Sequence, residues 1–297
     1  MSAVAFFGAV ETGLLYGFLS LGVYLSFRVL KFPDLTVDGS FPLGAAVVGT
    51  LIVAGWNPFL ATGVAMLAGC AAGLCTAILS VRFGILNLLA SILTMIALYS
   101  INLRIMGKPN LALLNQPSVL DPFKAWLRSV PDLVAMPLVL LVGVGVAKLL
   151  VDAFLNSEIG LAMRATGLNP VMAQAQGINT DRLILLGMAL SNGLAALSGA
   201  LFAQLYGFAD VTLGVGTVVV GLATVILGEA LLPSGSVVLA TLAVVIGSVL
   251  YRIAIALALN SSFLGFQAQD LNLVTAILVV LALTLPNSKW LTRLKRS

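Results

Sequence analysis

The sequence predicts an all-α polytopic membrane protein with about nine transmembrane helices, and composition, long apolar runs and charge placement all support this. Apolar residues make up 60% of the 297-residue chain, whereas charged residues make up only 9%. A soluble core of this size cannot bury so much apolar surface. The few charges gather between the apolar runs. Residues 1–297 are therefore expected to form a single transmembrane domain.

Apolar runs of roughly 17 to 25 residues, long enough for a helix to cross the hydrocarbon layer, define the expected spans. The first run has no Lys or Arg before it and is longer than a signal-peptide core, so it is interpreted as a retained span. The second and seventh are short and glycine-rich, which favours broken helices, although 206–236 could instead hold a re-entrant pair. The expected spans are 4–27, 40–55, 58–81, 85–105, 133–155, 183–205, 214–231, 236–256 and 271–286.

Lys and Arg residues divide unevenly between the two sides that these spans define. The richer side is expected to be cytoplasmic, which places the N-terminus outside and the C-terminus inside. The loop from 106 to 132 is then external, and Phe123–Arg128 could form a helix in the membrane interface. The expected cytoplasmic cations are Arg28, Lys31, Arg82, Arg164, Arg182, Lys289, Arg293, Lys295 and Arg296, against Arg104, Lys108, Lys124, Arg128 and Arg252 outside.

Several function classes are disfavoured by residues that the sequence lacks. The chain has no His, which excludes Ser-His and Cys-His nucleophile pairs and His-ligated zinc. Cys70 and Cys75 lie within one apolar run and are interpreted as packing residues. No basic, aromatic-interleaved patch indicates nucleic-acid binding. No catalytic residue, metal site or cofactor is expected on this chain, and a transporter is favoured over an enzyme.

A short pattern, F-x-D-apolar-T, occurs twice. It appears at Phe32–Thr36 and again at Phe208–Thr212, and each copy leads into a glycine-interrupted apolar run. The predicted topology places the first copy at the inner side and the second at the outer side. This favours an inverted repeat whose broken helices approach a central pathway, with coincidence as the alternative.

The segment from Lys31 to Gly44 combines two prolines with several short polar residues. Asp38 or Ser40 is expected to cap the second span. Carboxylates this close to lipid are costly unless they face water, protein or a pathway, so Asp34 has either a pathway role or a turn role. Glu229 is interpreted as an anchor at the inner end of its span. The predicted solute-pathway residues are Asp34, Thr36, Asp38, Gly39, Asn87, Asn192, Asp210 and Thr212.

The polar segment from Glu158 to Arg182 lies between long apolar runs and has a helical pattern. Ser157 or Asn156 can cap a first helix, Asn169-Pro170 can start a second, and Gly177 can end it. Small side chains allow another surface to approach closely, and Arg164 offers a charged anchor. The alternative is a connector with no partner.

At these residues the chain resembles the permease subunits of the branched-chain amino acid and ribose class of ABC importers. The segment I-G-L-A-M-R-A-T-G-L-N-P-V-M-A-Q-A-Q-G-I-N is similar to their cytoplasmic coupling segment, and Asp34–Ser40 and Val220–Gly228 are similar to other family elements. The wording F-P-D-L-T-V-D-G-S-F most resembles a branch paired with tryptophan- or tyrosine-binding proteins. The residues expected to couple to an ATPase are Glu158, Gly160, Ala162, Arg164, Ala165, Asn169, Ala173 and Gly177.

The resemblance implies a fold like that of a type II ABC importer in the bacterial inner membrane. The chain has no G-x-x-x-x-G-K-[ST] loop, so ATP and Mg²⁺ are expected on a separate ATPase docked at 156–182. An extracytoplasmic binding protein, a second permease copy in a homodimer and membrane lipid are the other expected partners. The expected substrate is an aromatic or branched-chain amino acid or a related solute. The alternatives are an ion-gradient carrier that uses Asp34, Asp38 or Glu229, and a channel or scaffold.

Overall fold

The computed structural model describes residues 3–126, 131–233, 235–259, 276–277 and 280. Six of its helices are long and apolar enough to cross a membrane: α1 with its terminal turn η1 (Ala3–Val23 and Tyr24–Val29), α3 (Pro58–Val81), α4 (Asn87–Met106), α6 (Asp132–Asn156), α9 (Thr180–Tyr206) and α11 (Val237–Leu259). Two shorter apolar helices, α2 (Val37–Val53) and α10 (Thr217–Leu231), match the expected second and seventh spans. The ninth expected span falls almost entirely outside the described residues.

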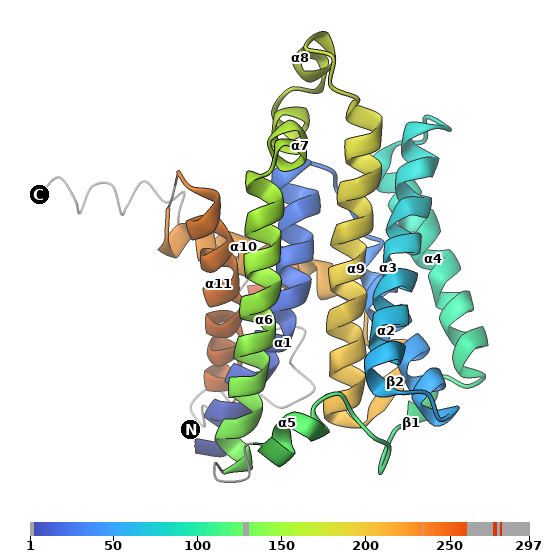
Figure 1. Ribbon diagram of the computed structural model, residues 1–297, viewed down its shortest axis with the longest axis vertical. Coiled ribbons are helices and arrows are strands. Elements are labelled where there is room, and N and C mark those ends of the chain that lie inside the picture. Colours follow the sequence, from blue (N-terminus) through green and yellow to red (C-terminus); the bar gives the residue numbers. More distant parts are fainter. Residues whose placement is uncertain (1–2, 127–130, 234, 260–275, 278–279, 281–297) are drawn as a thin grey trace, which may run out of the picture.

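Short elements cover the two ends of this bundle (Figure 1). Helices α7 (Glu158–Leu168) and α8 (Pro170–Ala175) lie at one end, between α6 and α9. Helix α5 (Asp121–Trp126) and strands β1 (Asn110–Ala112) and β2 (Phe208–Asp210) lie at the other. The strands pair antiparallel, with Asn110 opposite Asp210. This strand pair was not expected from the sequence.

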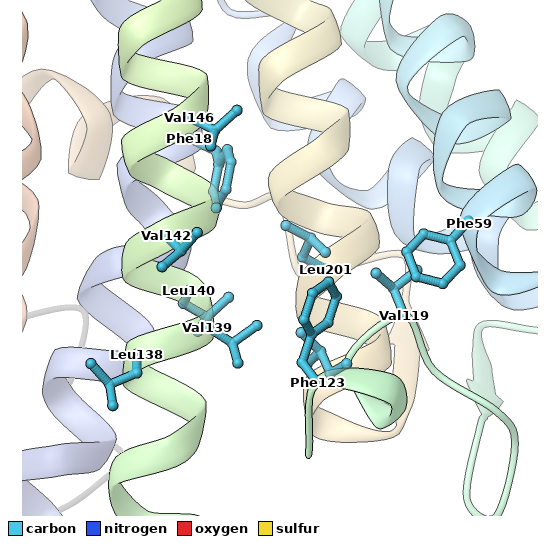
Figure 2. Close-up of a pocket in the computed structure, with 12 residues that line it drawn as sticks. Phe18, Phe59, Val119, Phe123, Leu138, Val139, Leu140, Val142, Val146 and Leu201 are labelled. Atoms are coloured by element: carbon cyan, nitrogen blue, oxygen red, sulfur yellow. The ribbon is translucent and has the colours of Figure 1, made fainter. Parts of the chain in front are cut away.

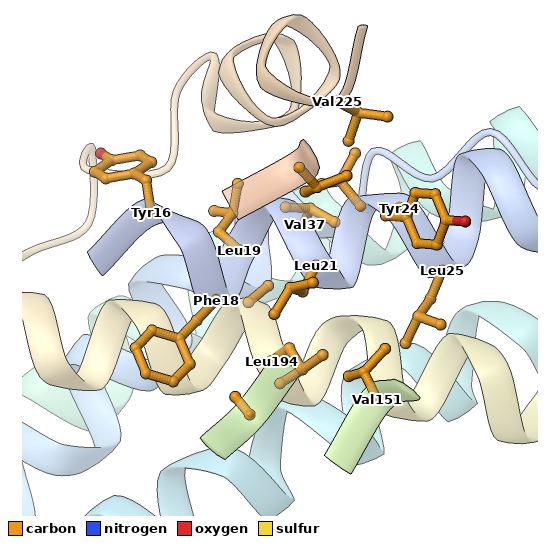
Figure 3. Close-up of a cluster of buried hydrophobic side chains, with 14 of the residues drawn as sticks. Tyr16, Phe18, Leu19, Leu21, Tyr24, Leu25, Val37, Val151, Leu194 and Val225 are labelled. Atoms are coloured by element: carbon orange, nitrogen blue, oxygen red, sulfur yellow. The ribbon is translucent and has the colours of Figure 1, made fainter. Parts of the chain in front are cut away.

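Helix α1 forms the centre of the bundle and is buried from Gly13 to Val23. Its apolar side chains meet residues from several helices, including Val37, Val151, Leu194 and Val225 (Figure 3). The last turn of α1 is a π-helix, Tyr24–Val29. Such turns are rare and occur often at functional sites.

The helices pack through small residues. A Cβ on Gly44 of α2 would lie 1.9 Å from the carbonyl oxygen of Ala196 in α9. A Cβ on Gly199 of α9 would lie 1.9 Å from the carbonyl oxygen of Phe41 in α2. A Cβ on Gly13 of α1 would meet the α11 backbone at 2.7 Å. Because lipid offers no hydrophobic drive for helix association, such close backbone contact is a main source of stability within a membrane.

The packing supports the predicted inverted repeat. Helix α9 runs antiparallel to α3, as Gly73 packs on Met188 and Gln204 bonds to Thr62. Helix α1 runs antiparallel to α11 in the same way. The short helix α2 packs beside α9, and the short helix α10 packs beside α1. Helices α1 to α3 thus correspond to α9 to α11, with the opposite direction across the bundle (Figure 1).

Candidate functional site

A fully buried polar network surrounds the first copy of the F-x-D-apolar-T pattern. The Asp34 carboxylate accepts hydrogen bonds from the Thr36 N–H at 2.9 Å and from Nδ2 of Asn192 at 2.7 Å. The Ser40 hydroxyl donates to Oδ1 of Asn192 at 2.7 Å, and the Thr36 hydroxyl lies 2.7 Å from that of Thr76. The network therefore joins the 30–36 loop to α2, α3 and α9.

The two short helices meet at their N-termini. Asp38, in the first turn of α2, accepts bonds from the Val218 N–H at 2.7 Å, the Thr217 hydroxyl at 2.9 Å and the Gly216 N–H at 3.2 Å. A carboxylate at a helix start satisfies free N–H groups and interacts favourably with the helix dipole. Asp38 therefore caps α10.

This contact corrects the expected capping of the second span. Neither Asp38 nor Ser40 caps α2, because Asp38 faces α10 and Ser40 bonds to Asn192. The N-cap position of α2 is Thr36, which makes no side-chain capping bond. Within α2, Pro42 has no N–H to donate to the carbonyl oxygen of Asp38 four residues earlier. Gly214 packs directly against that carbonyl, and a Cβ on Gly214 would lie only 1.7 Å from its oxygen. Glycine is required at this approach.

A cavity of about 380 Å³ opens beside this junction. Its walls come from the start of α2, the middle of α4 and the 211–215 loop. Asn102 is fully buried in the wall, whereas Tyr99 and Ser100 are exposed. The lining residues are Asp38, Gly39, Pro42, Met95, Ile96, Tyr99, Ser100, Asn102, Val211 and Val215. An apolar pocket with a few converging polar groups is the usual form of a small-molecule site.

A second hollow, of about 460 Å³, lies between α6 and α9 (Figure 2). Phe18, Phe59, Phe123 and Leu201 surround it together with aliphatic residues of α6. This lining offers no side-chain hydrogen bond to a polar solute. The first cavity is therefore the better candidate for a solute site.

The α7–α8 segment forms an apolar surface at one end of the bundle. Both helices begin as expected, because the Ser157 side chain accepts from the Gly160 N–H and the Asn169 side chain from the Met172 N–H. Gly177 has a positive φ of 81° just after α8. Five large apolar side chains on the two helices are exposed, namely Ile159, Leu161, Leu168, Val171 and Met172. Exposed apolar patches with a polar rim usually mark interaction sites.

The predicted coupling residues divide between the two faces of this segment. Gly160 and Ala173 are buried and hold the helices against the bundle; Ala162, Arg164 and Ala165 are half-buried. Glu158, Asn169 and Gly177 are exposed. A Cβ on Gly167 would lie 1.8 Å from the Val29 carbonyl oxygen, so α7 rests directly on the end of the π-helical turn. The exposed leucines were missed in the prediction.

One ion pair joins two helices, and a second lies within α6 beside a hydrogen bond from α11. Arg28, at the π-helical turn, donates to Glu229 of α10 at 2.6 Å, with side chains 60% and 30% exposed. This confirms Glu229 as an anchor. In α6, Lys148 pairs with Asp152 at 2.5 Å, and the Thr241 hydroxyl of α11 donates to Asp152 at 2.5 Å. Cys70 and Cys75 are both free thiols.

The second copy of the pattern lies at the end that carries β1 and β2. The N–H and hydroxyl of Thr212 donate to Asp210 Oδ1 at 2.7 and 2.6 Å, and Asn110 donates to Oδ2 at 3.3 Å. Partial burial by itself would raise the pKa of Asp210, but these hydrogen bonds hold that pKa below its ordinary value.

The predicted pathway residues therefore do not lie together. Asp34, Thr36 and Asn192 belong to the buried network, whereas Asp38 and Gly39 line the cavity. Asn87 bonds to Ser80 where α3 turns into α4, and Asp210 and Thr212 lie at the other end. The prediction omitted Tyr99, Ser100 and Asn102, although an Asn within an apolar helix was a usable signal.

Two short apolar helices that meet at their N-termini within a helical bundle, beside a small cavity, are typical of multi-pass membrane proteins that move solutes. The chain matches the family model described as "Branched-chain amino acid transport system / permease component" over residues 5–285. It belongs to this permease family, and it is a transporter subunit and not an enzyme.

Two curated proteins are similar to this chain. The "Tyrosine transport system permease protein" of Clostridioides difficile (strain R20291) is 41% identical over 274 residues, which cover 92% of this chain and 88% of that protein. An uncharacterized protein of Rickettsia prowazekii (strain Madrid E) is 38% identical over 210 residues, covering 70% and 71%. No solved structure shows significant similarity to the chain.

Proposed function

We propose that this chain is the membrane subunit of an ATP-driven importer that takes up an amino acid with an aromatic or apolar side chain. The substrate class is supported by the tyrosine transport permease that is 41% identical to this chain. The exposed apolar surface on α7 and α8 is the observation that best supports coupling to an ATPase. ATP and Mg²⁺ belong to that partner, since the chain lacks a phosphate-binding loop of its own.

A mechanical path leads from this surface to the short helices. Gly167 of α7 rests on Val29, and Arg28 next to it is paired with Glu229 of α10. The loop that follows Val29 leads directly into α2. A displacement of α7 by an ATPase would therefore act on both short helices, whose start positions are joined by Asp38. Alternating access needs such a two-state element between the drive and the pathway.

In this proposal, two copies of the chain form the pathway in a bacterial inner membrane. The α7–α8 end faces the cytoplasm, because Arg28, Arg82 and Arg182 lie at helix ends on that side. The N-terminus and the β1–β2 pair face outward, where a solute-binding protein delivers its cargo. The C-terminus, expected in the cytoplasm, lies outside the described residues.

The test is co-purification of the ATPase subunit encoded with this chain. Val171→Asp places a charge on an exposed side chain, and Arg164→Glu reverses the predicted anchor. Each should reduce ATPase recovery about tenfold or more, the usual effect of a charge placed in an apolar interface. Arg104→Glu, on an exposed position of α4 far from this surface, is the control. Unchanged recovery with both α7–α8 variants would contradict the proposed docking site.

A further inference from the structure

The cavity between α2, α4 and the 211–215 loop has an unusual wall residue in Asn102. This side chain is fully buried, and its Nδ2 donates to the Gly39 carbonyl at 3.2 Å. Its Oδ1 has no hydrogen-bond partner among the described residues. A buried acceptor left without a donor costs about 1–3 kcal/mol, so the site favours a ligand that supplies one.

The other polar groups of the cavity define the charge of that donor. Asp38 is the charged residue of the lining, and its carboxylate already holds the start of α10 in place. Its carboxylate oxygens are turned toward α10, so its negative charge lies in the wall of the cavity at a fixed position. A negative charge and an unsatisfied acceptor attract a cationic hydrogen-bond donor and repel an anion.

The remaining walls are apolar. Pro42, Met95, Ile96, Val211 and Val215 surround the space, and the ring of Tyr99 adds an aromatic surface. The volume of about 380 Å³ suits a small solute. We propose that this cavity is a binding site for a solute that carries a primary ammonium group beside an apolar or aromatic side chain, with Asn102 accepting a hydrogen bond from the ammonium and Asp38 attracting its charge.

This inference deepens the proposed function and rests on it for the meaning of the site, but its test needs neither an ATPase nor transport. In purified full-length protein in nanodiscs, S100C places a thiol at the cavity in a background without native thiols (Cys70→Ala, Cys75→Ser). The probes are 2-aminoethyl and 2-sulfonatoethyl methanethiosulfonate. Cys75 provides a matched control in the Cys70→Ala protein, because it is exposed in an apolar groove between α3 and α4, and α4 also lines the cavity.

The ratio of labelling rates, ammonium reagent over sulfonate reagent, should be about tenfold higher for the S100C thiol than for Cys75. Asn102→Leu in the S100C protein should remove most of this preference, and Thr94→Val, a change on α4 outside the cavity lining, should not. Tyramine should slow labelling of S100C, whereas 3-(4-hydroxyphenyl)propionate should not. Equal rate ratios at the two thiols, or equal protection by the two phenols, would overturn the inference.

The proposed function can fail separately. A chain that proves to be driven by an ion gradient would still show the ammonium preference at S100C. If the chain proves to be an ATP-driven permease but S100C shows no ammonium preference, the proposed binding site is wrong and the proposed coupling surface still stands.

Discussion

The two copies of the F-x-D-apolar-T pattern fold alike but lie in opposite surroundings. In both, the Asp side chain accepts the N–H of the Thr two residues later, at 2.9 Å for Asp34 and 2.7 Å for Asp210. Asp34 is fully buried under α9, whereas Asp210 is at the surface beside β1. The local turn is therefore a property of the pattern, and the cost of losing it depends on the neighbours.

The largest difference between the two copies should appear when each Asp is replaced by Leu. Asp34→Leu leaves the Thr36 N–H without its acceptor and removes one of the two hydrogen bonds of Asn192 Nδ2, which keeps its bond to the Met188 carbonyl, and should cost roughly 2–5 kcal/mol of stability. Asp210→Leu should cost much less, since water replaces the lost bonds. Thermal unfolding of the purified variants measures both. Equal shifts in melting temperature would show that burial of the network contributes nothing.

The tightness of helix packing also differs between the contact of α2 with α9 and the corresponding contact of α10 with α1. A Cβ on Gly199 would meet the Phe41 backbone at 1.9 Å, whereas one on Gly221 of α10 would meet the side chains of Val23 and Leu19 at 2.6 and 3.0 Å. Side chains can move more easily than backbone. Gly199→Ala should therefore cost roughly 1–3 kcal/mol, and Gly221→Ala less. A greater loss of thermal stability for Gly221→Ala would reverse this assignment.

The junction of the halves should respond more weakly. Thr217→Val removes one of the hydrogen bonds to Asp38 and keeps the side-chain shape, and should cost about 1 kcal/mol. Hydrogen exchange of the α10 amides should rise, because the start of that helix is less well held. Exchange in α6 provides the internal control. No change in α10 would mean that Asp38 does not stabilise the helix start.

The smallest effect is a pH dependence at Asp210. Its pKa is lower in the fold than in the unfolded chain, so its contribution is present above the unfolded value of about 3.9 and is lost as the pH falls through the folded pKa. Exchange of the Thr212 amide, corrected for its intrinsic rate, should therefore rise below about pH 4. Asp210→Asn should show no such rise. A rise of the same size in that variant would assign the effect to another group.

The sequence was sufficient for the order and lengths of the described spans, because apolar run length and Gly and Pro placement decide them locally. It also allowed the two helices at 158–175 to be predicted from Ser157 and Asn169. Contacts between distant segments were not predictable: Asp38 reaches residue 218, and β1 and β2 are three-residue strands separated by about a hundred positions. The cavity was not predicted for the same reason, since Asn102 becomes part of its wall only through its hydrogen bond to Gly39, a residue far away in the sequence.

The most direct test of the account is solute uptake by proteoliposomes. Purified chain is reconstituted with its co-encoded ATPase and binding protein, or alone, and uptake of labelled L-tyrosine is measured. The account predicts uptake that requires ATP and all three components, and none from the chain alone under a pH or sodium gradient. Gradient-driven uptake by the chain alone would contradict it and assign the energy coupling to the intramembrane carboxylates.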